Sequence, residues 1–229
     1  MGAIENRIIE GVAWLPLLQG LAPDVVARLA TGAALHSVPR GTEIFRQGQP
    51  GSGLYAIRHG QVKLSLEGDD GQEKVFDLLG PNACFGEPSL YLQKPHLVTA
   101  MAISDTDLVH LDRSTLLREL TGNAELACRV ITQLAERLYR RAGDVKSYML
   151  MSGTQRVICF LLHEMPFDCV EGGEVELPAR KGIIASRLNL TQEHFSRILR
   201  ELVSSDLIRV RGQMVRIVDM EGLRAKAFG

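Results

Sequence analysis

The sequence predicts an α+β protein in three parts: short helices with a β-barrel, one long helix, and a C-terminal helical module with a basic hairpin. Three observations indicate this. Residues of about 35–115 alternate apolar and polar with a period of two, and glycines interrupt them, which is typical of many short strands. Residues 123–150 have unbroken helical periodicity. Residues 181–217 hold two short helical patterns and a hairpin. We therefore expect domains at 1–122, 123–151 and 152–229.

The first part begins with short helices and continues as strands. In "LAPDVVARLATGA" the apolar residues Leu21, Val25 and Leu29 recur at steps of four, and Pro23 lies near the start, as expected for a helix. From residue 35 onward the runs "GTEIFRQG", "GLYAIRHGQVKLSLEG" and "TDLVHLD" alternate instead. Glycines mark the expected turns between them: Gly41, Gly48, Gly60, Gly71, Gly80 and Gly86.

The long helix carries a narrow apolar stripe. A helix of about 28 residues spans about 42 Å, longer than a small barrel can cover. Charged residues flank the stripe, and steps of three and four are typical of a coiled-coil seam, so we expect a homodimer. A helix packed only on its own domain is the alternative. The stripe consists of Ala127, Ile131, Leu134, Leu138, Ala142, Val145 and Met149, and we assign dimerisation to Ile131, Leu134, Leu138 and Val145.

The long helix is expected to break at Ser152–Thr154. Gly153 lowers helix stability there, and Thr154 is predicted to cap the next helix. We expect a hairpin at "VEGGEVEL" and a second, basic one at "VRGQMVRIVD", with Gly212 in its turn.

The segment "RKGIIASRLNLTQEHFSRILREL" predicts two short helices joined by a sharp turn. The first spans about 181–188, and Ala185 allows the second helix to pack closely against it. Asn189 tolerates the left-handed backbone that such a turn needs. Thr191 is predicted to cap the second helix, which Phe195 and other apolar residues anchor.

The polar side of this second helix predicts DNA recognition. A helix-turn-helix presents the N-terminal residues of its second helix to the major groove. Arginine there can donate two hydrogen bonds to guanine, and glutamate can accept one from cytosine. The alternative is an ordinary surface helix whose charges only keep it soluble. The basic hairpin is expected to lie over phosphates as a wing. The candidate DNA-binding residues are Thr191, Gln192, Glu193, Ser196, Arg197, Arg200, Lys181 and Arg211.

Charge and composition agree with this assignment. The net charge is −1, but residues 179–229 hold ten Lys and Arg against five Asp and Glu, which gives a basic segment of +5 on an acidic body. The four cysteines are scattered, as expected in a reducing cytoplasm. The apolar runs are too short to span a membrane. No catalytic triad, phosphate loop or metal-ligand spacing stands out, so we expect a protein that is not an enzyme.

The whole chain resembles the CRP/FNR family of bacterial transcription regulators. The segment "GTEIFRQGQPGSGLYAIRHGQVKLS" is similar to the family's barrel, and Glu193, Ser196 and Arg197 match the E-x-x-S-R pattern of its FNR branch. The resemblance implies a cyclic-nucleotide-binding-type double-stranded jelly roll, a dimerisation helix and a winged helix-turn-helix. It also implies TTGAT-like inverted repeats as the DNA site and RNA polymerase as a partner, with the acidic turn "EGDDGQEK" as one candidate contact.

The same resemblance implies an effector pocket in the barrel. Cyclic-nucleotide binders hold the ribose with a Gly-Glu pair, and this chain keeps Gly86 and Glu87. Thr99 also matches, but Val98 stands where the phosphate-binding arginine is expected, and an unpaired buried anion is costly. His96 is the alternative cation. Arg141 replaces a residue that contacts the base. We therefore expect an effector other than cyclic AMP; a cyclic-nucleotide-responsive regulator, or a ligand-binding regulatory subunit of an enzyme, is the alternative.

An FNR-type iron–sulfur cluster is also disfavoured, because residues 1–83 contain no cysteine. The phrases "FRQGQP", "GQEK" and "EHFSRI" resemble the Dnr-type branch of nitric-oxide-responsive regulators. That resemblance implies nitric oxide as the signal and haem b as the cofactor. The candidate haem ligands are His36, His96, His110 and Cys84, with Met101 as a weaker one.

Overall fold

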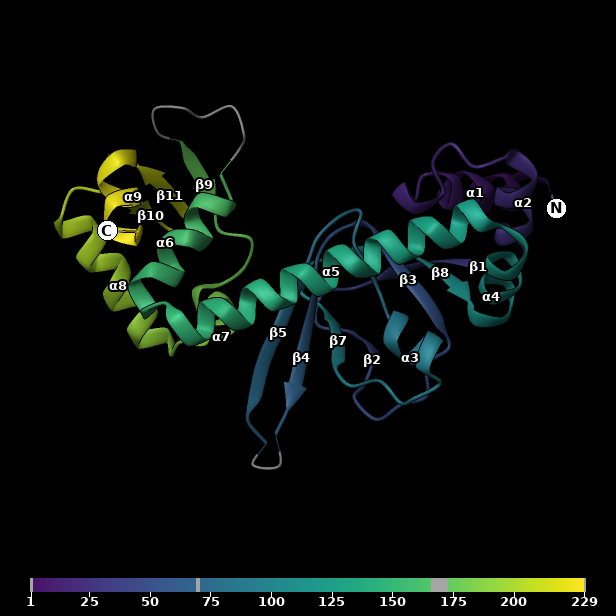
Figure 1. Cartoon of the computed structure of the whole chain (residues 1–229), viewed down its shortest axis with the longest axis horizontal. Helices are drawn as coiled ribbons and strands as arrows, with labels where there is room; N and C mark the ends of the chain where they lie inside the picture. The colour runs from purple at the N-terminus through teal and green to yellow at the C-terminus, as the bar shows by residue number, and fades with distance from the viewer. Residues whose placement is uncertain (1, 69–70, 166–172, 229) are drawn as a thin grey trace. The chain divides into compact units, whose positions relative to one another are not determined.

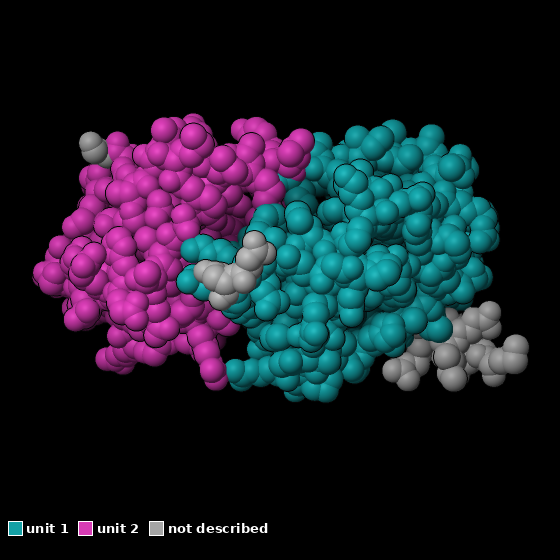
Figure 2. Space-filling model, turned by 90° about the horizontal axis from the view of Figure 1, so that it is seen from below, with its two compact units in different colours: residues 1–137 teal, residues 138–229 magenta. Residues whose placement is uncertain are grey.

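The computed structural model describes residues 2–68, 71–165 and 173–228. The chain divides into two compact units, Met1–Arg137 and Leu138–Gly229, shown in two colours in Figure 2. The division falls inside the longest helix. In the described part of the chain, none of the helices has the length and apolar character required to cross a membrane.

The first unit is a sandwich of two antiparallel four-stranded sheets with helices at its ends (Figure 1). The strand orders are β1-β8-β3-β6 and β2-β7-β4-β5. This confirms the jelly-roll barrel. Its helices are α1 (Gly2–Ala13), η1 (Pro16–Leu18), α2 (Pro23–Ala30), α3 (Glu87–Leu92) and α4 (Arg113–Gly122). Its strands are β1 (Ala33–Val38), β2 (Glu43–Phe45), β3 (Gly53–His59), β4 (Val62–Glu67), β5 (Glu73–Leu79), β6 (Cys84–Phe85), β7 (Thr99–Ala102) and β8 (Thr106–Asp112).

Two apolar clusters hold this unit together. One fills the sandwich and includes Phe45, Ile57 and Phe85. The other joins the N-terminal helices to β3 and β8 and contains Leu29 and Leu116. Burial of apolar surface of this extent is the main favourable contribution to folding.

The long helix α5 (Ala124–Leu150) changes character along its length. Its start is capped by Asn123, whose side-chain oxygen accepts a 2.9 Å hydrogen bond from the Leu126 amide. Leu126 and Val130 are buried in the first unit, so the first two turns pack on their own domain. The four assigned seam residues are exposed beyond that point, with exposed fractions from 37% for Leu134 to 72% for Leu138. The alternative therefore describes the first turns of the helix, and the dimer seam stays a prediction for the exposed turns that follow.

The second unit adds a helix-rich module to the last turns of α5. It contains α6 (Gly153–His163), β9 (Glu174–Glu176), α7 (Lys181–Arg187), α8 (Gln192–Ser204), β10 (Ile208–Arg211), β11 (Met214–Ile217) and α9 (Met220–Phe228). The strands form one sheet of order β10-β11-β9. The basic hairpin is confirmed, and Gly212 in its turn has a φ of 61°. The other expected hairpin lies partly at 166–172, outside the described residues; its described part, β9, pairs with β11.

The expected cap at Thr154 is wrong, because α6 begins two residues earlier. Ser152 is the N-cap: its hydroxyl accepts from the Gln155 amide, and the Gln155 side chain accepts from the Ser152 amide at 2.8 Å. This reciprocal pair satisfies two amides that the helix leaves free, so it outweighs the unfavourable helix propensity of Gly153.

Candidate DNA-binding surface and effector site

Helices α7 and α8 form a tight helix-turn-helix. Asn189 has a φ of 55°, which confirms the left-handed turn, and the Leu190 amide donates to the Ala185 carbonyl at 2.9 Å. Ala185 is fully buried. The Thr191 hydroxyl accepts from the His194 amide at 3.2 Å, so Thr191 caps α8 as expected. Gly182 lies close to the start of α8: a Cβ there would be 2.7 Å from the Gln192 side-chain oxygen, so a larger residue would require that flexible side chain to move.

The two faces of α8 are cleanly separated. Phe195, Ile198, Leu199 and Leu202 are buried and hold the helix on the unit. The candidate contact residues lie on the other face. Gln192, Glu193, Arg197 and Arg200 are exposed, and Ser196 is half-buried. The guanidinium of Arg197 lies 3.8 Å from the carboxylate of Glu201, and 63% of the Arg197 side chain is exposed. Such a loose surface ion pair stabilises little, so the side chain can turn to a ligand.

The hairpin β10–β11 places arginines on its outer face. Arg209 lies directly opposite Arg216, and Arg211 lies opposite Met214; all three arginines are exposed. Like charges directly opposite each other on a sheet destabilise it, and a bound phosphate would relieve that repulsion. Lys181, at the start of α7, is half-buried.

The structure brings Gly86 and Glu87 together with a residue that the sequence analysis missed, Arg137. Gly86 has a φ of 92° and leads into α3. One oxygen of Glu87 accepts a 2.5 Å hydrogen bond from the Arg137 guanidinium, which also donates to the Cys84 carbonyl. Glu87 is 8% exposed, and its other oxygen, Oε2, has no hydrogen-bond partner in the described part of the chain. Oε2 of Glu87 can therefore accept a hydrogen bond from a ligand. The positive charge of Arg137 is already paired with Glu87 and is not free for an anionic ligand.

Of the remaining pocket candidates in the first unit, neither Val98 nor Thr99 donates a hydrogen bond to Glu87 in the described part of the chain. The side chain of Val98 packs against the barrel core. Thr99 is buried, and its hydroxyl accepts a 3.0 Å hydrogen bond from the Gln47 amide. Arg141 forms a 3.0 Å ion pair with Asp144.

His96 cannot supply the missing positive charge at neutral pH. It is 4% exposed, lies flat on Phe45 with ring centroids 3.6 Å apart, and shares a hydrogen bond with Ser89. Burial lowers the pKa of His96, so its ring is neutral near pH 7.

The haem candidates differ in their surroundings, and their role as axial ligands stays a prediction. His96 is enclosed as just described. His110 shares a 3.1 Å hydrogen bond with Ser52, and its ring centroid lies 6.2 Å from that of His36, an exposed residue on the neighbouring strand. Burial, followed by the charge of Glu87, raises the pKa of Cys84 to about 12, so its thiol is protonated and a poor ligand. Met101 is half-buried on β7.

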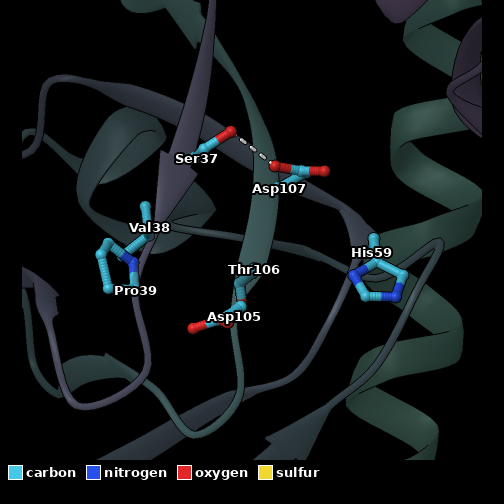
Figure 3. Close-up of a pocket in the computed structure, with 7 residues that line it drawn as sticks. All are labelled: Ser37, Val38, Pro39, His59, Asp105, Thr106 and Asp107. Carbon is cyan, nitrogen blue, oxygen red and sulfur yellow. Dashed lines mark hydrogen bonds between the residues drawn. The ribbon is translucent and has the colours of Figure 1, made fainter.

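One shallow depression of about 300 Å³ lies at an end of the sandwich (Figure 3). None of the residues that line it belongs to the expected sites. Its acidic groups are already satisfied: Asp107 accepts from Ser37 at 2.7 Å, and Asp105 accepts from the Arg40 amide. We assign it no ligand.

Replacing Arg137 by leucine is expected to destabilise the protein by about 1–3 kcal/mol, because it leaves the Glu87 carboxylate buried without its partner. The Arg137 side chain is 26% exposed, so solvent offsets part of the loss. Urea unfolding measures the change. Arg140→Leu is the matched control, since Arg140 is exposed on the same helix. Adding Glu87→Gln to the Arg137 variant should restore part of the stability; an unchanged midpoint in Arg137→Leu would contradict this assignment.

Comparison with known proteins matches both units of the chain. Residues 35–123 match the cyclic nucleotide-binding domain, and residues 155–226 match the Crp-like helix-turn-helix domain. The CRP-like cAMP-activated global transcriptional regulator of Mycobacterium tuberculosis is 28% identical over 214 residues, which cover 92% of this chain and 96% of that protein.

Two solved structures show the same architecture. FixK2 from Bradyrhizobium japonicum has a TM-score of 0.75 at 23% identity, covering 84% of this chain and 96% of that one. DNR from Pseudomonas aeruginosa has a TM-score of 0.51 at 27% identity, covering 98% of both chains. The first of these likenesses concerns the fold alone. Each of these likenesses extends over both units of the chain.

Proposed function

Because the chain is a CRP/FNR-type transcriptional regulator, with an effector-binding domain and a DNA-binding helix-turn-helix, we propose that it works as a homodimer that binds an inverted repeat of TTGAT-like half-sites. The observation that carries this proposal is the row Glu193, Ser196 and Arg197 on the polar face of α8, in which Glu193 and Arg197 are exposed and Ser196 is half-buried. In a helix-turn-helix these positions face base edges in the major groove. Arg197 reads guanine, and Glu193 accepts from cytosine.

The other candidate residues contact the backbone in this proposal. Thr191 and Gln192 lie at the start of α8, and Lys181 lies at the start of α7. Arg200 lies about two turns further along α8, and Arg211 extends the contact through the wing. Phosphate contacts fix the register of a protein on DNA without reading its sequence. The seam residues of α5 join two copies of the chain. Exposed leucine and isoleucine at heptad spacing pack against the same residues of a second helix, which removes their apolar surface from water.

We assign the roles by segment: residues 1–122 sense the effector, 123–151 dimerise, and 152–229 bind DNA. A regulator that binds DNA in this way acts in the cytoplasm of a bacterial cell, and its protein partner is RNA polymerase. The candidate contact in the turn "EGDDGQEK" includes Asp69 and Asp70, which lie outside the described residues.

The expected effector is not cyclic AMP. A cyclic phosphate needs a buried cation, and Val98 and neutral His96 supply none. Addition of cyclic AMP should therefore leave DNA binding unchanged. Nitric oxide sensed through haem stays a prediction from the resemblance, with His36 and His110 as the candidate ligands that are not enclosed. An absorption spectrum of the purified protein mixed with haem tests this hypothesis. The absence of a Soret band, together with DNA binding that nitric oxide does not change, would contradict it.

A gel shift tests the proposed function. The full chain is titrated onto a duplex with a TTGAT inverted repeat, onto one with a single half-site, and onto a scrambled duplex. We expect tight binding only to the repeat, and an affinity that falls steeply with salt because phosphate contacts release counterions. Equal affinity for all three duplexes would contradict sequence-specific recognition. No binding to any of them would favour the alternative, a ligand-binding regulatory subunit of an enzyme.

A further inference from the structure

Arg187 differs from the exposed arginines of the helix-turn-helix and wing, because it points back into its own unit. It lies in the last turn of α7, and its side chain is 19% exposed. One guanidinium nitrogen donates to both carboxylate oxygens of Asp144, at 3.2 and 3.0 Å. Another donates to the Tyr148 hydroxyl at 2.8 Å. An arginine held by charge-assisted bonds of this kind is fixed in orientation.

Tyr148 closes the arrangement by returning a hydrogen bond to the same residue. Its hydroxyl donates to the Arg187 carbonyl at 2.7 Å. Burial raises the pKa of Tyr148, so the hydroxyl keeps its proton at neutral pH and can donate. The Arg187 carbonyl lies at the C-terminal end of α7, where helix carbonyls lack partners within the helix. We call Asp144, Tyr148 and Arg187 the α5–α7 clamp.

The clamp is attached to α5 directly beside the dimer seam. Asp144 and Tyr148 are four residues apart and therefore lie on one stripe of the helix. Val145, a seam residue, follows Asp144 in the chain. Asp144 also accepts from Arg141 at 3.0 Å. The carboxylate is thus held by arginines on both α5 and α7, so its position is set by two elements at once.

A second arginine holds the same turn from α6. Arg156 donates to the Leu188 carbonyl at 3.0 Å and to the Asn189 carbonyl at 3.4 Å, and it also donates to the Met151 carbonyl at the end of α5. Its guanidinium carbon lies 6.0 Å from the centre of the Tyr148 ring. The turn between α7 and α8 is therefore connected by polar contacts to the last turns of α5.

We propose that Arg187 is a positioning residue: through the α5–α7 clamp it sets the angle between the helix-turn-helix and the seam helix, and so the half-site spacing that the dimer accepts. This inference rests on the proposed function. In a two-fold dimer a rotation at the clamp moves both recognition helices, and two half-sites must lie about 34–36 Å apart, or one helical turn, to be read together. Arg187 makes no DNA contact in this arrangement.

The test compares Arg187→Gln and Tyr148→Phe with the unchanged full-length chain. Binding is measured by fluorescence anisotropy on inverted repeats whose centre is lengthened or shortened by one and two base pairs. The unchanged chain should prefer one spacing. Both variants should bind that spacing about tenfold more weakly and lose most of the preference, because the recognition helices are no longer held at one angle. Their affinity for a single half-site should be unchanged.

The salt dependence separates positioning from phosphate contact. Arg209→Gln is the matched control from the wing. It should weaken binding at every spacing equally and reduce the slope of log affinity against log salt by about 0.9, the value for one lost phosphate contact. Arg187→Gln should leave that slope unchanged. A slope reduced by this amount in Arg187→Gln, or an unchanged spacing preference in both variants, would overturn the inference.

Amide hydrogen exchange tests the clamp without DNA. Loss of the Arg187 contacts should speed exchange in the last two turns of α5 and in α7, while the β10–β11 hairpin and the barrel keep their protection. This result is independent of the inverted repeat. If the unchanged chain fails to bind the repeat, the proposed function is wrong; if α5 and α7 exchange at unchanged rates in Arg187→Gln, the clamp itself is wrong.

Discussion

Replacing Arg197 by alanine is expected to cost about 1–3 kcal/mol of binding free energy on the inverted repeat and to relax selectivity at one guanine of each half-site. The physical reason is the loss of two hydrogen bonds to one base edge. Little is lost in the free protein, because in the described part of the chain Arg197 forms an ion pair only with Glu201, at 3.8 Å on the surface. Affinities for duplexes that carry each of the four bases at that position measure the change.

The control is Arg224→Ala, which removes an equal charge from α9, away from the α7–α8 pair. It should leave affinity and selectivity nearly unchanged at moderate salt. Uniform weakening on all four bases in Arg197→Ala would mean that the guanidinium touches only phosphate. In that event the base-reading role would pass to Glu193, whose replacement by alanine would then be the variant that relaxes selectivity.

Replacing Leu138 by aspartate is expected to convert the protein to monomers and to lower its affinity for the repeat at least a hundredfold, or about 2.7 kcal/mol and more. Leu138 is 72% exposed in the single chain and lies in the middle of the seam. In the dimer this position is enclosed by the partner helix, and an unpaired carboxylate there is costly to bury. Sedimentation equilibrium measures the association, and the gel shift measures binding.

Tyr139→Asp is the matched control, because Tyr139 is 83% exposed and follows Leu138 on a different face of α5. It should leave both the dimer and the affinity intact. Circular dichroism should show the same helix content for both variants. A Leu138→Asp protein that still sediments as a dimer would place the interface on another surface.

The features that the sequence predicts well are those that local chemistry decides. Asn189 at a left-handed turn, Thr191 at a helix start and Gly212 in a hairpin each follow from the preferences of one residue type. The apolar ladder of α8 follows from helical spacing, and all of its members are buried. The wrong cap at Thr154 is instructive, since the choice between two neighbouring cap residues depends on Gln155, three residues after the true cap.

The features that the sequence analysis missed depend on partners distant in the chain. Arg137 is an ordinary charged residue on a helix until the fold brings Glu87 and the Cys84 carbonyl to it. Arg187 counts among the basic residues of the C-terminal segment, yet Asp144 and Tyr148 hold it inside the unit. A cue was present in the spacing of Arg137, Arg141, Asp144 and Tyr148 at steps of four, three and four along one stripe of α5.

By itself, the sequence determined the order of barrel, long helix and helix-turn-helix, because periodicity and turn residues act over a few neighbours. It also determined which face of α8 carries polar side chains. Only the tertiary structure decided which titratable side chains carry a charge that is available to a ligand. Arg197 is exposed, whereas Arg187 is clamped and His96 is neutral, buried flat against the ring of Phe45. The reason is that burial and ion pairing change what a titratable side chain can do, and both depend on contacts between residues far apart in the chain.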